Sequence, residues 1–281
     1  MSSAQVLLGV TPTILAVLGS SSTELAMVGM IAQRPLLSTL LALGSPSIYM
    51  SRAFEYTDPA QLLQDRRGRL KQKSMAGWKF KFVLLAEYAV ALAAIANVAT
   101  INWDLGVKTI CSIWSDNVIA PLLWSTLVIA LHALGCFCLR IQIRRKVMTD
   151  EAVDSVGWAK AWARGFMRFV RETSHTEFKP ASSQEDLRVT VFQEGPIVVV
   201  VLWALSTAIV CQVLYGTIVL SSLYFIGPED ALKVIARFMA SVLACRIVCM
   251  YEIAVLRENC TEIDFEYVEP ENRFVYKSHH E

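Results

Sequence analysis

The sequence predicts an all-α fold, a polytopic membrane bundle of about five transmembrane helices with an amphipathic helix on its cytoplasmic face. Three observations lead to this prediction. Hydrophobic residues make up 54% of the 281 residues and charged residues only 18%, whereas charged residues are roughly 25% of a typical soluble chain. The hydrophobic residues are gathered in long runs, and the basic residues lie in alternate segments between those runs. We therefore treat residues 1–281 as a single membrane domain.

Five hydrophobic runs are long enough to cross a membrane as helices. Runs of about 18 or more apolar residues span the hydrocarbon core, and a helix satisfies its own backbone hydrogen bonds there. Some of the runs are almost free of charge, whereas the first contains Glu24 and the last contains several charged side chains. The predicted spans lie near residues 10–33, 82–101, 118–139, 196–220 and 231–254.

The distribution of Lys and Arg predicts the orientation of the bundle. Nine of these residues lie in 34–81, ten in 140–195 and three in 257–281, whereas the segment 102–117 contains only Lys108. Basic segments stay on the cytoplasmic side of a membrane. We therefore predict that the three basic segments are cytoplasmic and that the N-terminus is outside or lumenal, in the endoplasmic reticulum or another endomembrane.

Two further segments are expected to lie at or in the membrane without crossing it. Residues 36–50 are apolar but too short to span comfortably, and they are either interfacial or re-entrant. Residues 157–171 place Trp158, Trp162 and Phe166 on one helical face and basic residues on another. This pattern predicts an amphipathic helix that binds anionic lipid, with a calmodulin-type partner site as the alternative.

Ionisable residues inside predicted spans are the functional candidates, because a charge in lipid is costly and therefore rare. Counted from the basic residue at each cytoplasmic helix end, four of them lie roughly 9 to 16 Å from the inner surface at about 1.5 Å per residue. We expect Glu252, nearer the end of its span, to extend to the interface. The four candidate catalytic residues are Glu24, Glu87, His132 and Arg246, and Arg237 is a fifth ionisable residue in a span.

Two interpretations of this layer of ionisable residues stay open. In the first, Arg246 pairs with Glu24 or Glu87, His132 takes a hydrogen bond, and the polar groups hold the helices together. In the second, the groups line a cavity in which a desolvated carboxylic acid donates a proton. Further polar residues in the spans would add to the lining of such a cavity: Tyr88, Asn97, Gln212 and Tyr215.

No cofactor or metal is expected. A membrane haem commonly needs two facing histidines, and His132 is the only histidine in a predicted span. The seven cysteines fall mostly within spans, where buried thiols are usually inert. The chain has no phosphate-binding glycine loop and no nucleophile elbow. Nucleic-acid binding is not expected either, because membrane topology accounts for the basic residues.

One resemblance is carried by the N-terminal fifth of the chain. The run Ala-Val-Leu-Gly-Ser-Ser-Ser-Thr-Glu at 16–24, followed by Arg-Pro-Leu-Leu at 34–37 and Leu-Gly-Ser-Pro at 43–46, resembles small multi-span membrane proteins of filamentous fungi. Some of these are encoded beside terpenoid or indole-diterpenoid pathways. Membrane terpene cyclases of such pathways are similar in size and use intramembrane carboxylates to protonate an epoxide, but they have more spans than this chain.

Three functions follow as hypotheses. The first is an integral membrane protein of isoprenoid secondary metabolism, either a metal-independent acid-base cyclase or an accessory subunit. The second is a small-molecule transporter or channel component. Two features of the sequence argue against it: the predicted intramembrane charges lie at one depth, and no matching pair of broken helices is evident. The third is a scaffold for membrane-bound pathway enzymes. The expected partners are membrane lipids, a hydrophobic substrate and such enzymes.

Overall fold

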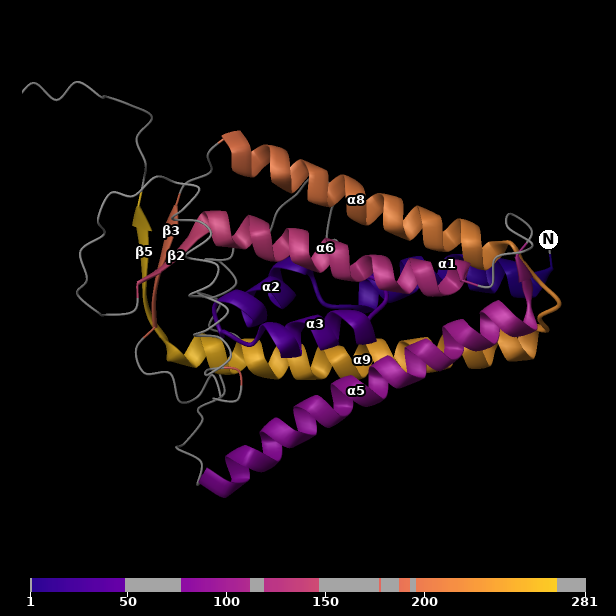
Figure 1. The fold of residues 1–281 in the computed structure, drawn as a ribbon, viewed down its shortest axis with the longest axis horizontal. Helices are drawn as coiled ribbons and strands as arrows, with labels where there is room; N and C mark the ends of the chain where they lie inside the picture. The colour runs from indigo at the N-terminus through magenta and orange to yellow at the C-terminus, as the bar shows by residue number, and fades with distance from the viewer. Residues whose placement is uncertain are drawn as a thin grey trace, which may run out of the picture.

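Seven helices make up most of the described chain, as predicted for an all-α fold (Figure 1). The computed structural model describes residues 2–48, 77–111, 119–146, 177, 187–192 and 196–266. The helices are α1 (Ser3–Leu18), α2 (Ser22–Met30), α3 (Pro35–Gly44), α5 (Gly77–Lys108), α6 (Ala120–Gln142), α8 (Pro196–Ser221) and α9 (Pro228–Asn259).

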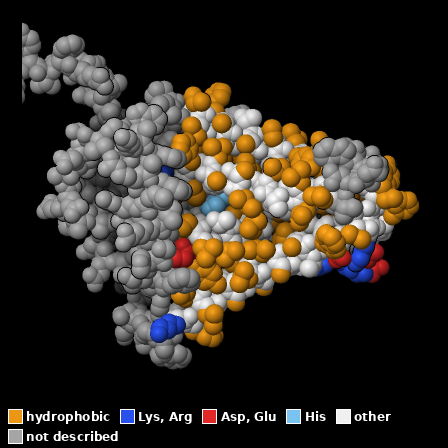
Figure 2. All heavy atoms as spheres, viewed as in Figure 1, with side chains coloured by type: hydrophobic (Ala, Val, Ile, Leu, Met, Phe, Trp, Pro, Cys, Tyr) orange, Lys and Arg blue, Asp and Glu red, His pale blue; other side chains and the backbone are white. Residues whose placement is uncertain are grey.

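Four of these helices, α5, α6, α8 and α9, are long and apolar enough to cross a membrane, as judged by length and composition. Their outer faces carry exposed hydrophobic side chains, and Leu85, Val200 and Ile247 are each 68% exposed. Hydrophobic atoms cover the middle of the helical face seen in Figure 2. Large apolar surfaces of this kind are stable against lipid and not against water. The chain is therefore an integral membrane protein with a helical bundle.

Residues 10–33 were predicted to form one membrane-spanning helix, but in the structure they do not form a single helix. Helix α1 ends at Leu18, and α2 begins only after Ser21. Ser21 has extended backbone angles, its hydroxyl accepts from the Glu24 N–H, and the Glu24 carboxylate accepts from the Ser21 N–H. This reciprocal capping starts a new helix and so interrupts the old one.

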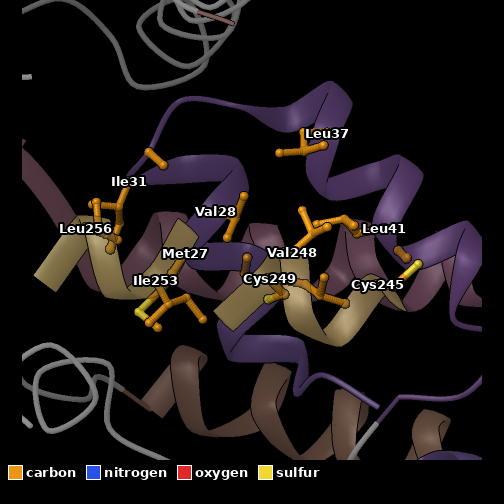
Figure 3. Packing of buried hydrophobic residues seen from close by; sticks show 14 of the residues in the cluster. Met27, Val28, Ile31, Leu37, Leu41, Cys245, Val248, Cys249, Ile253 and Leu256 are labelled. Carbon is orange, nitrogen blue, oxygen red and sulfur yellow. The ribbon is translucent and has the colours of Figure 1, made fainter. Parts of the chain in front are cut away.

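Helix α3 turns back and packs inside the bundle. Pro35 occupies its first turn, where the missing N–H costs nothing. The helix packs against α2, α5, α6 and α9, and Leu37 and Leu41 are fully buried. We refer to α2, α3 and the turn between them as the α2–α3 hairpin. Figure 3 shows its apolar side chains, Met27, Val28, Ile31, Leu37 and Leu41, opposite Cys245, Val248, Cys249, Ile253 and Leu256 of α9.

Short strands lie at the two ends of the bundle (Figure 1). At one end, β3 (Leu187–Phe192) pairs antiparallel with β2 (Ile143–Lys146) and parallel with β5 (Cys260–Glu266). At the other end, near the N-terminus, β1 (Ile110–Cys111) pairs with β4 (Leu223–Tyr224). We name these the sheet end and the N-terminal end.

The strands were not among the predicted elements, because the segments that contain them were expected to be loops and a tail. The predicted amphipathic helix at 157–171 lies outside the described residues. The orientation of the bundle in the membrane stays a prediction.

Candidate functional site

A buried ion cluster lies at the turn of the α2–α3 hairpin. The Arg34 guanidinium is 2.7 Å from a Glu87 carboxylate oxygen and 2.5 Å from a Glu252 carboxylate oxygen. Glu87 belongs to α5 and Glu252 to α9, so one side chain joins the hairpin to two long helices. The three residues are 1%, 6% and 3% exposed, respectively. We name these three residues the Arg34 cluster.

Glu177 covers the same turn from a distant part of the sequence. Its carboxylate accepts hydrogen bonds from the N–H groups of Leu36 (3.3 Å) and Leu37 (2.9 Å) and from the Tyr88 hydroxyl (2.7 Å). These N–H groups are at the start of α3, where a helix lacks internal acceptors and attracts negative charge. The ring of Tyr88 in turn lies 5.7 Å from the Arg34 guanidinium carbon, within cation–π range.

Two further polar contacts tie the hairpin to its neighbours. Arg246 of α9 forms an ion pair with Glu24 of α2. His132 of α6 lies with its Nε2 3.2 Å from the Ser38 hydroxyl of α3, and both side chains are buried. The hairpin is therefore connected by polar side chains to α5, α6 and α9.

The structure distributes the four predicted site residues over three places. Glu24 and Arg246 pair with each other, which is one of the two pairings predicted for Arg246. Glu87 pairs with Arg34, and His132 pairs with Ser38. The predicted layer of ionisable residues therefore surrounds the hairpin and does not converge on one site.

Sequence reasoning missed three residues of this network. Arg34 was interpreted as the basic residue that ends a helix on the cytoplasmic side, yet its side chain is buried. Glu252 was expected at the interface, and this was wrong because it is 3% exposed and paired with Arg34. Glu177 gave no signal, since it comes from a polar stretch without a pattern. The signal for Arg34 was its position between two apolar stretches that are each too short to span alone.

A second polar feature lies where non-helical backbone meets in the middle of the bundle. The break Gly19–Ser21 after α1 faces the residues Ser45–Ser47 that follow α3, and we name this pair of segments the central break. The Ser47 hydroxyl donates to the Pro12 carbonyl at 3.1 Å. A Cβ on Gly19 would lie 2.8 Å from the Ser47 carbonyl oxygen, so only glycine permits this approach.

Several contacts fix the depth of the central break. Gly44, directly before it, faces Ala94 of α5 and Cys245 of α9. At 1.5 Å per residue these two positions are about 20 Å from the helix ends at Lys108 and Asn259. The break is therefore far from both ends of the bundle, at a depth where the surrounding helices are apolar.

Gln212 of α8 joins the central break through its side chain. Its amide nitrogen donates to the Pro46 carbonyl at 2.7 Å, and the residue is 3% exposed. Its amide oxygen has no hydrogen-bond partner among the described residues. A buried acceptor without a donor is costly, and such atoms mark places where water or a ligand binds.

Comparisons with protein families, with curated proteins and with solved structures find no match to this chain. The chemistry of the two polar features follows from their own residues. Within the described ranges, no three His, Cys, Asp or Glu side chains are grouped to hold a metal ion. The carbonyl groups at the ends of α1 and α3 carry partial negative charge, and the Arg34 cluster places two carboxylates on one guanidinium.

Arg237, the fifth ionisable residue expected in a span, lies apart from both features. Its guanidinium donates to Asn97 at 3.0 Å and to the Thr100 hydroxyl at 2.9 Å, both on α5. The side chain is 43% exposed and approaches Asp104 toward the N-terminal end. This contact joins α5 to α9 on the outside of the bundle.

Proposed function

We propose that this membrane protein transports a small solute, and that the central break forms part of the path. The observation that carries the proposal is the meeting of two interrupted helices, α1 and α3, in the middle of an apolar bundle. Backbone that is not helical leaves N–H and C=O groups unsatisfied, and at membrane depth this is tolerated only inside protein or along a water-filled path. Secondary transporters commonly bind solute and coupling ions at such places.

The polar groups at the central break support a solute of polar or cationic character. The C-terminal ends of α1 and α3 both face it, so their carbonyl groups contribute partial negative charge. Ser20, Ser45 and Ser47 are buried there and add hydroxyl groups. The Gln212 amide oxygen adds an acceptor without a donor. Together these groups supply acceptors that a cation or a hydrogen-bond donor can use.

The α2–α3 hairpin is the element whose movement would open this path. It is short, it is joined to the break at both of its ends, and polar pairs connect it to α5, α6 and α9. Polar pairs can exchange partners or become hydrated, which gives the hairpin an alternative arrangement in addition to the apolar packing described above. We therefore assign the hairpin the role of the moving part.

A second candidate function is the acid-base enzyme of isoprenoid metabolism. The observation that favours it is the pair of buried carboxyl groups, Glu87 and Glu252, which share one guanidinium. A carboxyl group that stays protonated out of water can act as a general acid. The choice of isoprenoid substrates rests on the resemblance of the N-terminal fifth of the chain, and so does an accessory or scaffolding role beside pathway enzymes.

Metabolite measurements on a deletion strain separate the two functions. Loss of a transporter leaves the same compounds present but changes their ratio between cell and medium. Loss of an enzyme removes a product and accumulates its precursor. A deletion strain whose metabolites lose one compound altogether would overturn the transport proposal in favour of the enzyme, and an unchanged profile in cell and medium would overturn both.

Re-expression of variants links the result to the central break. Gln212→Leu removes the amide at the break and should fail to restore the cell-to-medium ratio. Thr207→Val on the same helix is the matched control, because the Thr207 hydroxyl donates only to the Trp203 carbonyl of its own helix and is exposed. Equal amounts of both variants in the membrane have to be verified by immunoblotting.

A further inference from the structure

We infer that Glu87 and Glu252 hold one proton between them, which makes the Arg34 cluster a proton-binding site. The site stands on its own geometry and does not depend on the transport role. The two carboxyl groups contact different terminal nitrogens of one guanidinium, at 2.7 Å and 2.5 Å.

The charges of the cluster do not balance unless a proton is bound. Arg34 keeps its positive charge in proteins, and it can neutralise one carboxylate. A second carboxylate at the same guanidinium leaves a net charge of −1 in a place that is almost closed to water. Burying an uncompensated charge is far more costly than protonating the group. Two carboxyl groups that share a site therefore retain one proton between them.

The unpaired oxygen atoms identify where the proton binds. Oε1 of Glu87 and Oε2 of Glu252 are buried and have no hydrogen-bond donor among the described residues. Each carboxyl group has its other oxygen on Arg34. A proton on either free oxygen neutralises that carboxyl group, and the other carboxylate then balances the charge of Arg34.

Other charged groups around the hairpin are already engaged or lie further out. Arg246 pairs with Glu24, and the Glu177 carboxylate accepts from two N–H groups and from Tyr88. Arg140 and Arg257 end their spans at the sheet end, where each has interactions of its own. Among the described residues, the remaining titratable groups around the hairpin are the imidazole of His132, the phenol of Tyr251 and the thiols of Cys136, Cys245 and Cys249.

Infrared spectroscopy of the purified protein tests this site directly. A protonated carboxyl group has a C=O stretching band that carboxylates lack and that shifts in heavy water. We expect this band at neutral pH in the natural protein and its loss in both Glu87→Gln and Glu252→Gln. Either substitution leaves one carboxylate for one guanidinium, so the reason to retain a proton disappears. Glu24→Gln is the matched control and should keep the band, because Glu24 has Arg246 to itself.

The melting temperature in detergent supplies a second readout. The folded protein binds a proton that the unfolded chain releases at neutral pH, so stability should fall as the pH rises from neutral to alkaline. Glu252→Gln should fold and lose most of this dependence. The inference is overturned if the natural protein lacks the band, if both single variants retain it, or if neither variant folds. Loss of the band on adding sodium chloride would assign the site to a metal cation and overturn it as well.

Discussion

Glu252 on α9 lies 2.5 Å from Arg34 at the turn of the α2–α3 hairpin, and both side chains are at most 3% exposed. The α2–α3 hairpin does not cross the bundle, and a buried ion pair connects its turn to α9. The hairpin also packs through apolar side chains in the core of the bundle, so breaking this ion pair would leave unpaired charge inside that core.

Replacing Arg34 should be severely destabilising. Arg34→Gln leaves Glu87 and Glu252 buried without their counter-charge, and breaking a buried ion pair in this way costs about 3 to 5 kcal/mol. The melting temperature of the purified protein in detergent measures the effect. Lys108→Gln is the control, because its pair with Asp104 is exposed and should change the melting temperature little. Equal effects of the two substitutions would contradict the importance of the buried cluster.

Gly44 should not tolerate a side chain. A Cβ at this position would lie 2.6 Å from the Cys245 sulfur and 3.0 Å from the Ala94 Cβ, so Gly44→Ala should cost about 1 to 3 kcal/mol through overpacking. Removing the sulfur in the double variant Gly44→Ala with Cys245→Ala should recover part of the loss. Gly135→Ala is the control, since its nearest neighbour would be 3.6 Å away. If the second substitution gave no recovery in thermal melting, α3 would not pack on α9 as described.

The contact between Ser38 and His132 should contribute only modestly to the stability of the protein. A double-mutant cycle with Ser38→Ala and His132→Ala should give a coupling energy of about 0.6 kcal/mol, the usual size for polar contacts between membrane helices. Unfolding of the four proteins in mixed micelles measures it. A coupling energy of zero would mean that the imidazole has another partner.

The stability that the Glu24–Arg246 ion pair contributes should depend on the presence of both charges. Glu24→Gln keeps a side chain that can cap α2, since Gln replaces Glu in a capping box, but it leaves Arg246 without its carboxylate. We expect a lower melting temperature for this variant. Adding Arg246→Met should restore much of the loss, because it removes the partly buried cation that Glu24→Gln leaves without a counter-charge. A further loss of stability in the double variant would argue against the pairing.

The long helices were predictable from sequence because hydrophobicity summed over about 20 residues is a strong signal. The helices α5, α6, α8 and α9 overlap four of the predicted runs. The interruption of the first run was also visible, since the residues Ser21-Ser22-Thr23-Glu24 carry a capping-box pattern. Total hydrophobicity outweighed this local signal, and so a single span was predicted.

The Arg34 cluster could not be predicted from sequence. Its residues, at positions 34, 87 and 252, are far apart in the chain and share no local pattern. They meet because α3 re-enters the bundle, and that course follows from tertiary packing. Arg34 directly precedes Pro35, and a residue before proline is a common helix boundary. The sequence therefore provided no reason to expect a buried partner for Arg34.

Accessibility of Ser47 in the membrane tests the central claim, that the interrupted helices line a path. The seven natural cysteines are first replaced, and Ser47→Cys is then exposed to a small hydrophilic thiol reagent in sealed vesicles. Leu85→Cys, on the lipid-facing surface, is the control. We expect the reagent to modify the thiol at position 47, although Ser47 is fully buried in the state described, and to leave the thiol at position 85 unmodified. A folded protein that leaves the thiol at position 47 unreactive from both sides would contradict it.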